Sequence, residues 1–535
     1  MTALRQLARG AALALSATVL LAGLAACDKR ADAPAPGASG TPSAPAGARA
    51  FTILAGSELK DLEPALIQAG RDAGVDVQLK YAGTLDIVER INAGDKFDAI
   101  LPPNGAYPAL ALAQHPLARD KLFYSRVALG VKPATLKALG WDRKAPSWAD
   151  IASAAASGKL HYAMTNPASS NTGMSALFAV ASASAGKSED LAVGDVDDKT
   201  LKAFLSGQKL TAGSSGWLAD AFVKDPSALD AMVNYEAVIL RSNDKLAPAD
   251  KLTLVYPRDG MISADYPLML LNADKRAEDS ALVAAIKAAP FQRDALAAAF
   301  LRPSNPDVAA SPALPTATAA ELSFPNKLEV IDAVLSAYQA QWRRPSTSIF
   351  VLDISGSMKG ARIEAMREAL KVLAGVDASS ASARYAAFQQ REHVVMIAFD
   401  NRVEAPEWIR FDQGDVAAAQ ARVRARADAL EARGGTAIFS AVATAEEVAR
   451  DELQDHPDRF VCIVLLTDGA NTAGMSLDKF RDLYAGGAPA RVFPILFGEG
   501  EVKEMTALAQ ATGGRPFDGR TARLAQVFKE IRGYQ

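Results

Sequence analysis

The chain has 535 residues, of which 50% are hydrophobic and 22% are charged, and its formal net charge is −3. This length allows two or three domains that each bury a core. The near-neutral charge gives no reason to expect nucleic acid as a partner. The sequence has two cysteines, Cys27 and Cys462, which are too few for a disulfide framework.

Residues 1–26 have the pattern of a signal peptide. Arg5 and Arg9 precede an apolar run, AALALSATVLLAGLAA, that is short for a stable spanning helix and stops before Cys27. An ordinary secretory signal is the simpler interpretation. The residues LAAC at 24–27, however, resemble the lipobox of bacterial lipoproteins, which are cleaved before an acylated cysteine.

That resemblance implies a lipid on Cys27 and a protein anchored to the bacterial cell envelope on the periplasmic side, rather than spanning a membrane. Asp28 resembles the signal that keeps such proteins in the inner membrane, with the outer membrane as the alternative. Residues 27–50 are rich in Ala, Pro, Gly and Ser and contain no aromatic residue, which predicts a disordered tether. Ordered sequence is expected from Phe51 onward, and the biased stretch 302–320 predicts a linker or surface excursion.

The last third of the chain alternates between apolar runs and helical patterns. The apolar runs predict four buried strands at residues 349–352, 394–399, 461–466 and 492–497. Between the first two runs, apolar residues recur at helical spacing at Ile363, Met366, Leu370 and Leu373. This alternation predicts an α/β domain whose parallel sheet is covered on both faces, although Pro494 weakens the last strand.

Oxygen-bearing side chains follow several of these strands. Asp353 ends the first run and is followed by Ser355 and Ser357, Thr436 begins a helical pattern after a glycine pair, and Asp468 directly follows the third run. The carboxyl ends of parallel strands meet at one edge of a sheet, where α/β folds bind ligands. Two carboxylates and three hydroxyls suit Mg²⁺ or Mn²⁺, with Ca²⁺ as an alternative. Taken singly, each residue is also a common turn or helix cap.

Together, DxSxS, a Thr after Gly-Gly and TDG after a strand resemble the von Willebrand factor A (VWA) domain, over residues 346–535. The resemblance implies a Rossmann-like fold with a central, mostly parallel sheet flanked by helices. It also implies a metal-ion-dependent adhesion site formed by Asp353, Ser355, Ser357, Thr436 and Asp468. In that family a carboxylate from a partner protein completes the metal's coordination, so the domain is expected to bind an unidentified protein with an acidic residue.

A Mg²⁺-dependent hydrolase is the less favoured alternative. Haloacid-dehalogenase phosphatases also place an Asp after their first strand, but they generally need a second Asp two residues later as a general acid. Ser355 stands there in this chain and cannot act as a general acid at neutral pH. The four histidines are scattered without metal-ligand spacing, and His161 and His393 are expected to be structural or surface groups. We therefore expect no enzymatic activity.

In the first half of the chain, small hydroxyl residues precede helical patterns at Ser57, Thr84 and Ser170. Helix N-termini attract anions because their unpaired N–H groups and the helix dipole both point at the ligand. Each residue taken alone is equally explained as a helix cap.

Residues 51–345 resemble a periplasmic solute-binding protein of the two-lobed type that serves ABC importers, on segments such as KFDAILPPNGAY and VNYEAVIL. The resemblance implies one lobe from about 51–130 plus 251–345 and a second from 131–250. Two crossing strands, near 124–132 and 251–258, would join them and allow hinge closure. It also implies Ser57, Thr84, Ser170 and Tyr235 as ligand contacts. These neutral donors suit a small anionic solute such as an oxyanion.

The whole chain resembles bacterial lipoproteins that join a substrate-binding domain to a VWA domain. We expect a sensor or adaptor in which solute-induced closure of the first domain changes how the second presents its metal site. Two alternatives stay open: an adhesin or assembly factor with a vestigial solute cleft, and the binding protein of an importer with an accessory VWA domain.

Overall fold

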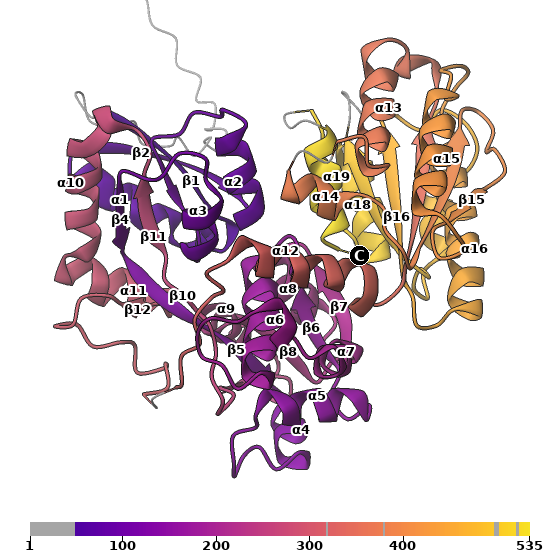
Figure 1. The fold of residues 1–535 in the computed structure, drawn as a ribbon. Helices are drawn as coiled ribbons and strands as arrows, with labels where there is room; N and C mark the ends of the chain where they lie inside the picture. Colours follow the sequence, from indigo (N-terminus) through magenta and orange to yellow (C-terminus); the bar gives the residue numbers. More distant parts are fainter. Residues whose placement is uncertain (1–48, 317–318, 378–379, 497–501, 521–523, 535) are drawn as a thin grey trace, which may run out of the picture. The chain divides into compact units, whose positions relative to one another are not determined.

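The computed structural model describes residues 49–316, 319–377, 380–496, 502–520 and 524–534 (Figure 1). These described residues form one compact unit, and three β-sheets are found among them. Cys27 and Asp28 lie outside the described residues. The first strand, β1 (Arg49–Gly56), begins two residues before Phe51, where ordered sequence was expected to start.

The first sheet has the strand order β2-β1-β3-β11-β4. Its strands are β1, β2 (Val75–Ala82), β3 (Ala99–Leu101), β4 (Ala118–Lys121) and β11 (Pro267–Leu270). β1 pairs in parallel with β2 and β3, whereas β11 runs antiparallel between β3 and β4. The helices of this lobe are α1 (Glu63–Asp72), α2 (Thr84–Asn92), α3 (Ala106–Ala111), α10 (Arg276–Lys287) and α11 (Leu296–Ala298), with 3-10 turns at Ser57–Leu62 and Ala273–Lys275 and a π-helical turn at Phe291–Ala295.

The second sheet has the order β10-β5-β8-β6-β7. Its strands are β5 (Phe123–Val131), β6 (Tyr162–Thr165), β7 (Gln208–Ala212), β8 (Ala231–Tyr235) and β10 (Ser263–Ala264), and β9 (Thr253–Val255) and β12 (Arg302–Pro303) also pair with β5. The helices of this lobe are α4 (Pro133–Ala138), α5 (Trp148–Ala156), α6 (Asn171–Ser184), α7 (Asp198–Ser206), α8 (Ser215–Lys224) and α9 (Glu236–Asn243), with a 3-10 turn at Val193–Asp195.

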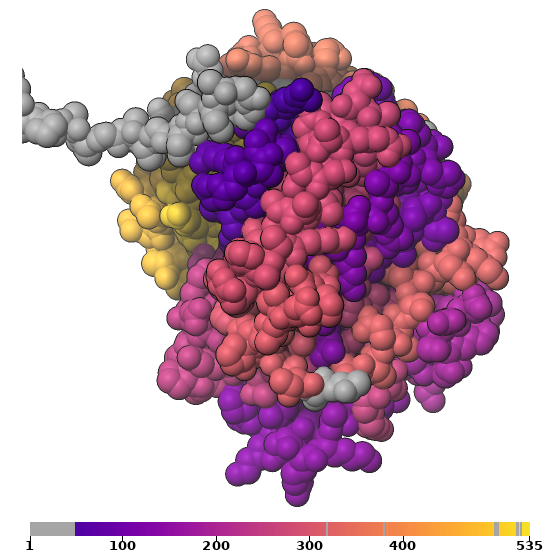
Figure 2. Space-filling model, turned by 90° about the vertical axis from the view of Figure 1, so that its left-hand side faces the viewer, coloured from indigo at the N-terminus to yellow at the C-terminus, as the bar shows by residue number. Residues whose placement is uncertain are grey.

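Three segments cross between these sheets. The chain passes from β4 in the first sheet into β5 in the second, returns through β9 and β10 to β11 in the first, and crosses again to β12, which pairs with β5. In the space-filling view of Figure 2, rose atoms of the segment after β10 lie beside the indigo atoms of the N-terminal residues. A buried ion pair joins β12 to α9: Arg302 binds both carboxylate oxygens of Glu236, at 2.6 and 2.9 Å, and the Tyr256 hydroxyl donates to the same carboxylate.

The chain then runs along the second lobe before it enters the last domain. The Ser323 N–H donates to the Ser188 carbonyl at 2.8 Å, whereas we expected residues 251–345 to belong with the first lobe. α12 (Leu328–Ala337) and a π-helical turn at Tyr338–Trp342 follow.

The third sheet has the order β15-β14-β13-β16-β17-β18, and all its pairs are parallel except β14 with β15. Its strands are β13 (Ser346–Asp353), β14 (Glu392–Phe399), β15 (Glu407–Arg410), β16 (Phe460–Thr467), β17 (Arg491–Leu496) and β18 (Phe517–Asp518). The four predicted strands are therefore present as β13, β14, β16 and β17, and β17 includes Pro494. Phe497, the last residue of the fourth predicted run, lies outside the described residues.

Helices cover both faces of this sheet. Successive side chains of β13 are therefore buried in two different cores, one on each face. The helices are α13 (Ala361–Leu373), α14 (Ala381–Ala386), α15 (Val416–Asp428), α16 (Ile438–Asp455), α17 (Leu477–Leu483), α18 (Val502–Thr512) and α19 (Leu524–Arg532), with a 3-10 turn at Gly356–Met358. Phe350 packs in one core with Met366 of α13, while Ile349 packs in the other with Val442 of α16. The α/β class and the doubly covered parallel sheet are confirmed.

A search of the described residues finds no helix with both the length and the apolar character needed to cross a bilayer.

Candidate functional site

The first candidate site lies at the carboxyl edge of the third sheet, where β13 ends in Asp353. The Asp353 side chain is fully buried, and one of its oxygens accepts a hydrogen bond from the Ser355 backbone N–H at 2.8 Å. Its second oxygen accepts from the Thr467 hydroxyl, the last residue of β16, at 2.7 Å. The loop after β13 therefore folds back on the carboxylate, and Ser355 and Ser357 meet with their hydroxyl oxygens 3.0 Å apart.

Asp468 and Thr436 reach this loop from two other connections. The Ser357 hydroxyl donates to Asp468 at 2.7 Å. A Cβ built on Gly469 would lie 3.7 Å from the Ser357 hydroxyl oxygen and 3.9 Å from that of Thr436, so these two hydroxyls flank the same glycine. The structure thus brings together all five residues that the sequence proposed as metal ligands. Ser357 is exposed, and the other four are nearly buried.

Backbone hydrogen bonds join the loop after β13 to the segment before Thr436. The Gly356 N–H donates to the Gly434 carbonyl at 3.0 Å, and the Arg433 N–H donates to the Ile354 carbonyl at 2.6 Å. Gly434 has a φ of +70°, a left-handed conformation that favours glycine. The glycine pair before Thr436 therefore allows a tight turn at this residue.

The donor set fits a small divalent cation. Burial raises the pKa of Asp353 and the negative charge of Asp468 adds to this, whereas hydrogen bonds from Ser355 and Thr467 lower it. A cation between two such carboxylates relieves the repulsion between them. Among the described residues, no three His, Cys, Asp or Glu side chains gather in a way that would hold a metal. Hard oxygen donors of this kind match Mg²⁺ or Mn²⁺.

Sequence reasoning missed two residues at this site. Thr467 was visible in the TDG motif, yet its bond to Asp353 depends on the pairing of β13 with β16. Arg362 on α13 forms an ion pair with Asp468 and also donates to the Ser357 carbonyl at 3.3 Å. The Arg362 side chain is 42% exposed, so it can leave Asp468 without unfolding the loop.

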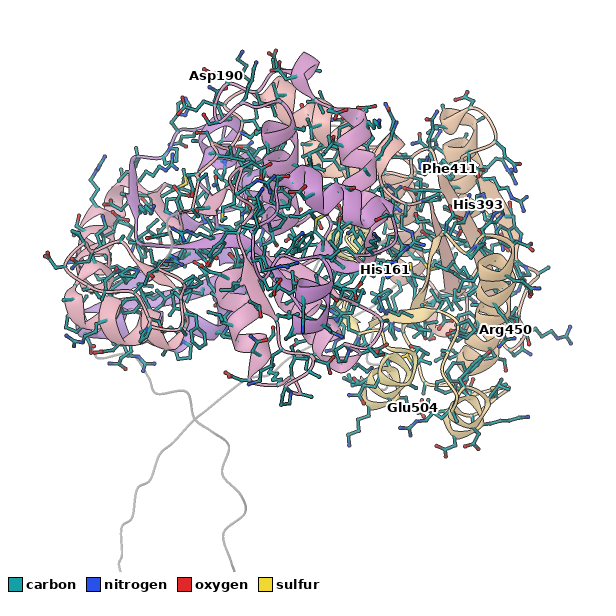
Figure 3. The ribbon with its side chains drawn as sticks, turned by 90° about the horizontal axis from the view of Figure 1, so that it is seen from below. His161, Asp190, His393, Phe411, Arg450 and Glu504 are labelled. Atoms are coloured by element: carbon teal, nitrogen blue, oxygen red, sulfur yellow. The ribbon has the colours of Figure 1, made fainter. Side chains whose placement is uncertain are left out.

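The histidines take no part in this site. His393 on β14 is buried between Glu452, 2.8 Å from its Nδ1, and Asp412, 2.9 Å from its Nε2. Figure 3 labels His393 in the last domain and His161 in the second lobe. The His161 N–H of the backbone donates to Asp230 at 2.7 Å. Both contacts agree with structural roles.

The second candidate site is a cleft between the two lobes, with a volume of about 270 Å³. Ser57 and Thr84 line it from the first lobe and Ser170 from the second. Tyr235 does not line this cavity: it is 1% exposed, and its hydroxyl accepts a hydrogen bond from Asn171 at 3.0 Å. Because Asn171 itself lines the cleft, Tyr235 supports the wall from behind instead of contacting a ligand directly.

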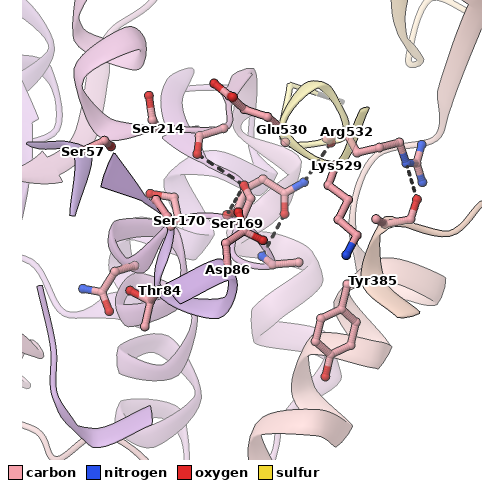
Figure 4. Close-up of a pocket in the computed structure, with 18 of the residues that line it drawn as sticks. Ser57, Thr84, Asp86, Ser169, Ser170, Ser214, Tyr385, Lys529, Glu530 and Arg532 are labelled. Atoms are coloured by element: carbon pink, nitrogen blue, oxygen red, sulfur yellow. Dashed lines mark hydrogen bonds between the residues drawn. The ribbon is translucent and has the colours of Figure 1, made fainter. Parts of the chain in front are cut away.

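Several helices begin at this cleft, as the hydroxyls drawn in Figure 4 illustrate. α2 begins after Gly83, α6 after Ser170 and α8 after Ser214, and in the described part of the chain no side chain caps these ends. The Thr84 hydroxyl is buried and has no hydrogen-bond partner among the described residues. Unpaired N–H groups and helix dipoles at such ends favour negative charge in general.

The lobes touch beside these hydroxyls. A Cβ on Gly83 would lie 2.4 Å from the Ser169 carbonyl oxygen, so only glycine allows the first lobe to approach the second this closely. Glu58 also lines the cleft, and burial raises its pKa to about 7. The sequence did not single out either residue.

Comparisons with known proteins identify two domain families in the chain. Residues 51–294 match the family model of bacterial extracellular solute-binding proteins, and residues 348–471 match that of the von Willebrand factor type A domain. A solute-binding-protein domain precedes a VWA domain. No curated protein matches the chain.

Solved structures resemble each domain separately. A von Willebrand factor type A protein from Catenulispora acidiphila is 24% identical over 36% of this chain and 42% of its own, with a TM-score of 0.29. The periplasmic binding protein P5PA is 16% identical over 54% of this chain and 99% of its own, with a TM-score of 0.42. A ferric binding protein from Campylobacter jejuni is 13% identical over 54% and 96%, with a TM-score of 0.41.

The VWA domain also contributes to the cleft of the solute-binding domain, which neither the sequence nor the family models indicate. Lys529, Glu530, Arg532 and Gly533 line the same cavity as Ser57 and Thr84. These residues lie more than 400 positions after those of the first lobe and form no motif with them. Sequence patterns therefore could not identify them as part of the cleft.

Proposed function

We propose that this protein is a non-enzymatic, lipid-anchored binding protein of the bacterial cell envelope. Its solute-binding domain takes a small oxyanion, and its VWA domain binds a protein partner through a divalent metal. The observation that carries the proposal is the convergence of Asp353, Ser355, Ser357, Thr436 and Asp468 from three connections at one sheet edge.

The metal would supply an electrophilic position for a carboxylate of the partner. Asp353 and the two serines are the ligands closest to one another in the sequence, and Thr467 keeps the Asp353 carboxylate oriented through its hydroxyl. Ser357 and Arg362 both contact Asp468. The position of the Asp468 carboxylate would therefore depend on whether it faces the Arg362 guanidinium or a metal ion. Mg²⁺ or Mn²⁺ fits this donor set better than Ca²⁺, which prefers a larger number of oxygen ligands.

For the cleft, the support is the set of uncapped helix N-termini with neutral hydroxyl donors. An oxyanion held by N–H and O–H groups gains affinity without a buried counter-ion. The lipid anchor on Cys27 rests on the sequence alone, and Asp28 favours the inner membrane.

Pull-down from detergent-solubilised membranes tests the VWA proposal. The tagged chain should retain a partner in Mg²⁺ and release it when the metal is chelated, and Asp353→Ala should retain none. A partner that stays bound after chelation would contradict metal dependence. Mass spectrometry of the N-terminal peptide would show whether Cys27 carries lipid.

Thermal melting against sulfate, phosphate and molybdate tests the cleft, because a ligand that binds only the folded state raises the melting temperature. The alternative of an adhesin or assembly factor with a vestigial cleft predicts no shift for any solute. An importer's binding protein with an accessory VWA domain predicts a shift but no metal-dependent partner.

A further inference from the structure

The end of the VWA domain forms part of the solute cleft. Lys529 and Arg532 belong to α19, and both line the cavity whose other walls are the two lobes. Figure 4 draws these side chains together with Ser57, Thr84, Ser169 and Ser170. Tyr385 of α14, another VWA residue, lines the cavity as well. The cleft therefore has three walls, and the third comes from a domain that begins nearly 300 residues after the first.

The third wall is packed against the second lobe. A Cβ on Gly533 would lie 2.6 Å from the Gly213 Cα and 2.7 Å from the Ser169 hydroxyl oxygen, which leaves no room for a side chain. Next to it, the ring of Tyr534 meets the edge of Trp217 on α8, with the ring centres 4.6 Å apart. Asn166 also donates to the Arg532 carbonyl at 3.5 Å.

The same helix also holds the first lobe. The Lys529 ammonium lies 2.6 Å from a carboxylate oxygen of Glu89, which stands on α2. The side chains are 12% and 25% exposed, so water screens this pair less than an ion pair at the surface. α2 is the helix that begins at Gly83 and Thr84, where the lobes touch. α19 thus contacts both lobes, one on each side of the place where they meet.

Lys529 and its cationic neighbours are each held by a carboxylate, but Glu89, the partner of Lys529, is 25% exposed, whereas Glu392 is fully buried. Arg532 and Arg343 both pair with the buried carboxylate of Glu392, and Arg515 pairs with Glu530. Lys529 lines the cavity, whereas Glu89, its partner, does not. An anion in the cleft can therefore compete with Glu89 for the ammonium group, and the competition sets how much positive charge the cleft offers.

We propose that residues 529–534 are a third wall of the solute site, that Lys529 adds a cation to anion recognition, and that α19 bridges the lobes. Solute binding is then a property of the two domains together. The part about Lys529 rests on the proposed oxyanion function, and the bridging does not.

Calorimetric titration of the full chain with sulfate, at constant ionic strength, tests the role of Lys529. Lys529→Gln should weaken binding by about tenfold, the worth of one charge-assisted hydrogen bond. Glu89→Gln should strengthen binding because it releases Lys529. In the double variant Lys529→Gln/Glu89→Gln, the effect of Glu89→Gln should vanish. Glu89 acts on sulfate binding through Lys529, so its replacement should have no effect once Lys529 is absent.

The matched control is Lys224→Gln. Lys224 on α8 donates to the Gln510 carbonyl of the VWA domain at 3.2 Å, so it joins the same two domains but does not line the cleft. Its loss should leave sulfate affinity unchanged. Equal effects of the two lysine variants, or a Glu89→Gln effect that persists without Lys529, would overturn the role of Lys529.

Hydrogen exchange tests the bridge without any ligand. Lys529→Glu should speed exchange in α2 and around residues 166–170 and leave the interior of α6 unchanged. If sulfate, phosphate and molybdate all fail to bind the unaltered chain, the oxyanion function and the role of Lys529 fail together, and this measurement still decides the bridge. Unchanged exchange in both segments would overturn it.

Discussion

The two sites of this protein are built in opposite ways. The VWA site comes from three connections at one edge of one sheet, and its proposed ligands lie within 116 residues, from Asp353 to Asp468. The solute cleft takes its walls from two lobes and from the last helix of another domain, over residues 57–533. A site made by one sheet edge leaves a short motif in the sequence, whereas a site made by packing domains leaves almost none.

The difference extends to electrostatics. The VWA site gathers two buried carboxylates whose repulsion a cation would relieve. The cleft gathers hydroxyls and helix N-termini, and the charged side chains around it are mostly held by partners of opposite sign. The two sites therefore call for ligands of opposite charge, and each can be broken without the other.

The largest effect is expected from Asp353→Ala. Removing this carboxylate takes away a proposed direct ligand, and the affinity for Mg²⁺ should fall by more than about 100-fold, because even outer partners of a metal ligand are worth about 10- to 100-fold. Calorimetric titration with Mg²⁺ measures the loss. Sulfate binding should be unaffected, and a parallel loss of both ligands would show that the sites are not separate or that the chain is misfolded.

Gly83→Ala tests whether the cleft depends on close approach of the lobes. The added methyl group would overlap the Ser169 carbonyl, so the lobes should stay further apart and sulfate affinity should fall by about tenfold, the cost of a typical packing conflict. Gly94, which has open space around its Cβ position but a positive φ, offers a control for general destabilisation. If Gly83→Ala binds sulfate as tightly as the unaltered chain, closure is not required.

Glu58 should make the cleft pH-dependent. Its pKa of about 7 lies above the ordinary value, so the side chain is neutral in acid and gains charge as the pH rises through 7. The negative charge repels an anion by about 1 kcal/mol, which weakens sulfate binding by about fivefold between pH 6 and pH 8. Glu58→Gln should bind sulfate equally at both pH values. If sulfate binding by this variant still depends on pH, a titratable group other than Glu58 causes the dependence.

Arg362→Gln is expected to have the smallest effect. Arg362 would compete with the proposed metal for Asp468, and at 42% exposure such a pair is worth less than about 1 kcal/mol. Its removal should raise Mg²⁺ affinity by about threefold in a calorimetric titration. A fall in affinity would show instead that Arg362 holds Asp468 in the geometry that the metal needs.

The sequence predicted the framework of the VWA domain well because strands buried on both faces are continuous apolar runs. It also identified the five oxygen-bearing residues that the structure brings to the end of β13. Thr467 and Arg362 escaped notice because their contacts depend on strand pairing and helix position. In the cleft, Ser57, Thr84 and Ser170 were found through helix starts, whereas Tyr235 lies behind the wall and Lys529 comes from another domain.

The most direct test of a two-ligand protein is thermal melting of the full chain with Mg²⁺ and millimolar sulfate, separately and together, at matched ionic strength. We predict that each ligand raises the melting temperature of the unaltered chain, that Asp353→Ala responds only to sulfate, and that Lys529→Gln responds fully to Mg²⁺ but weakly to sulfate. The proposal of two separate ligand sites would be contradicted by an unaltered chain that responds to neither ligand, or by an Asp353→Ala variant that still responds to Mg²⁺.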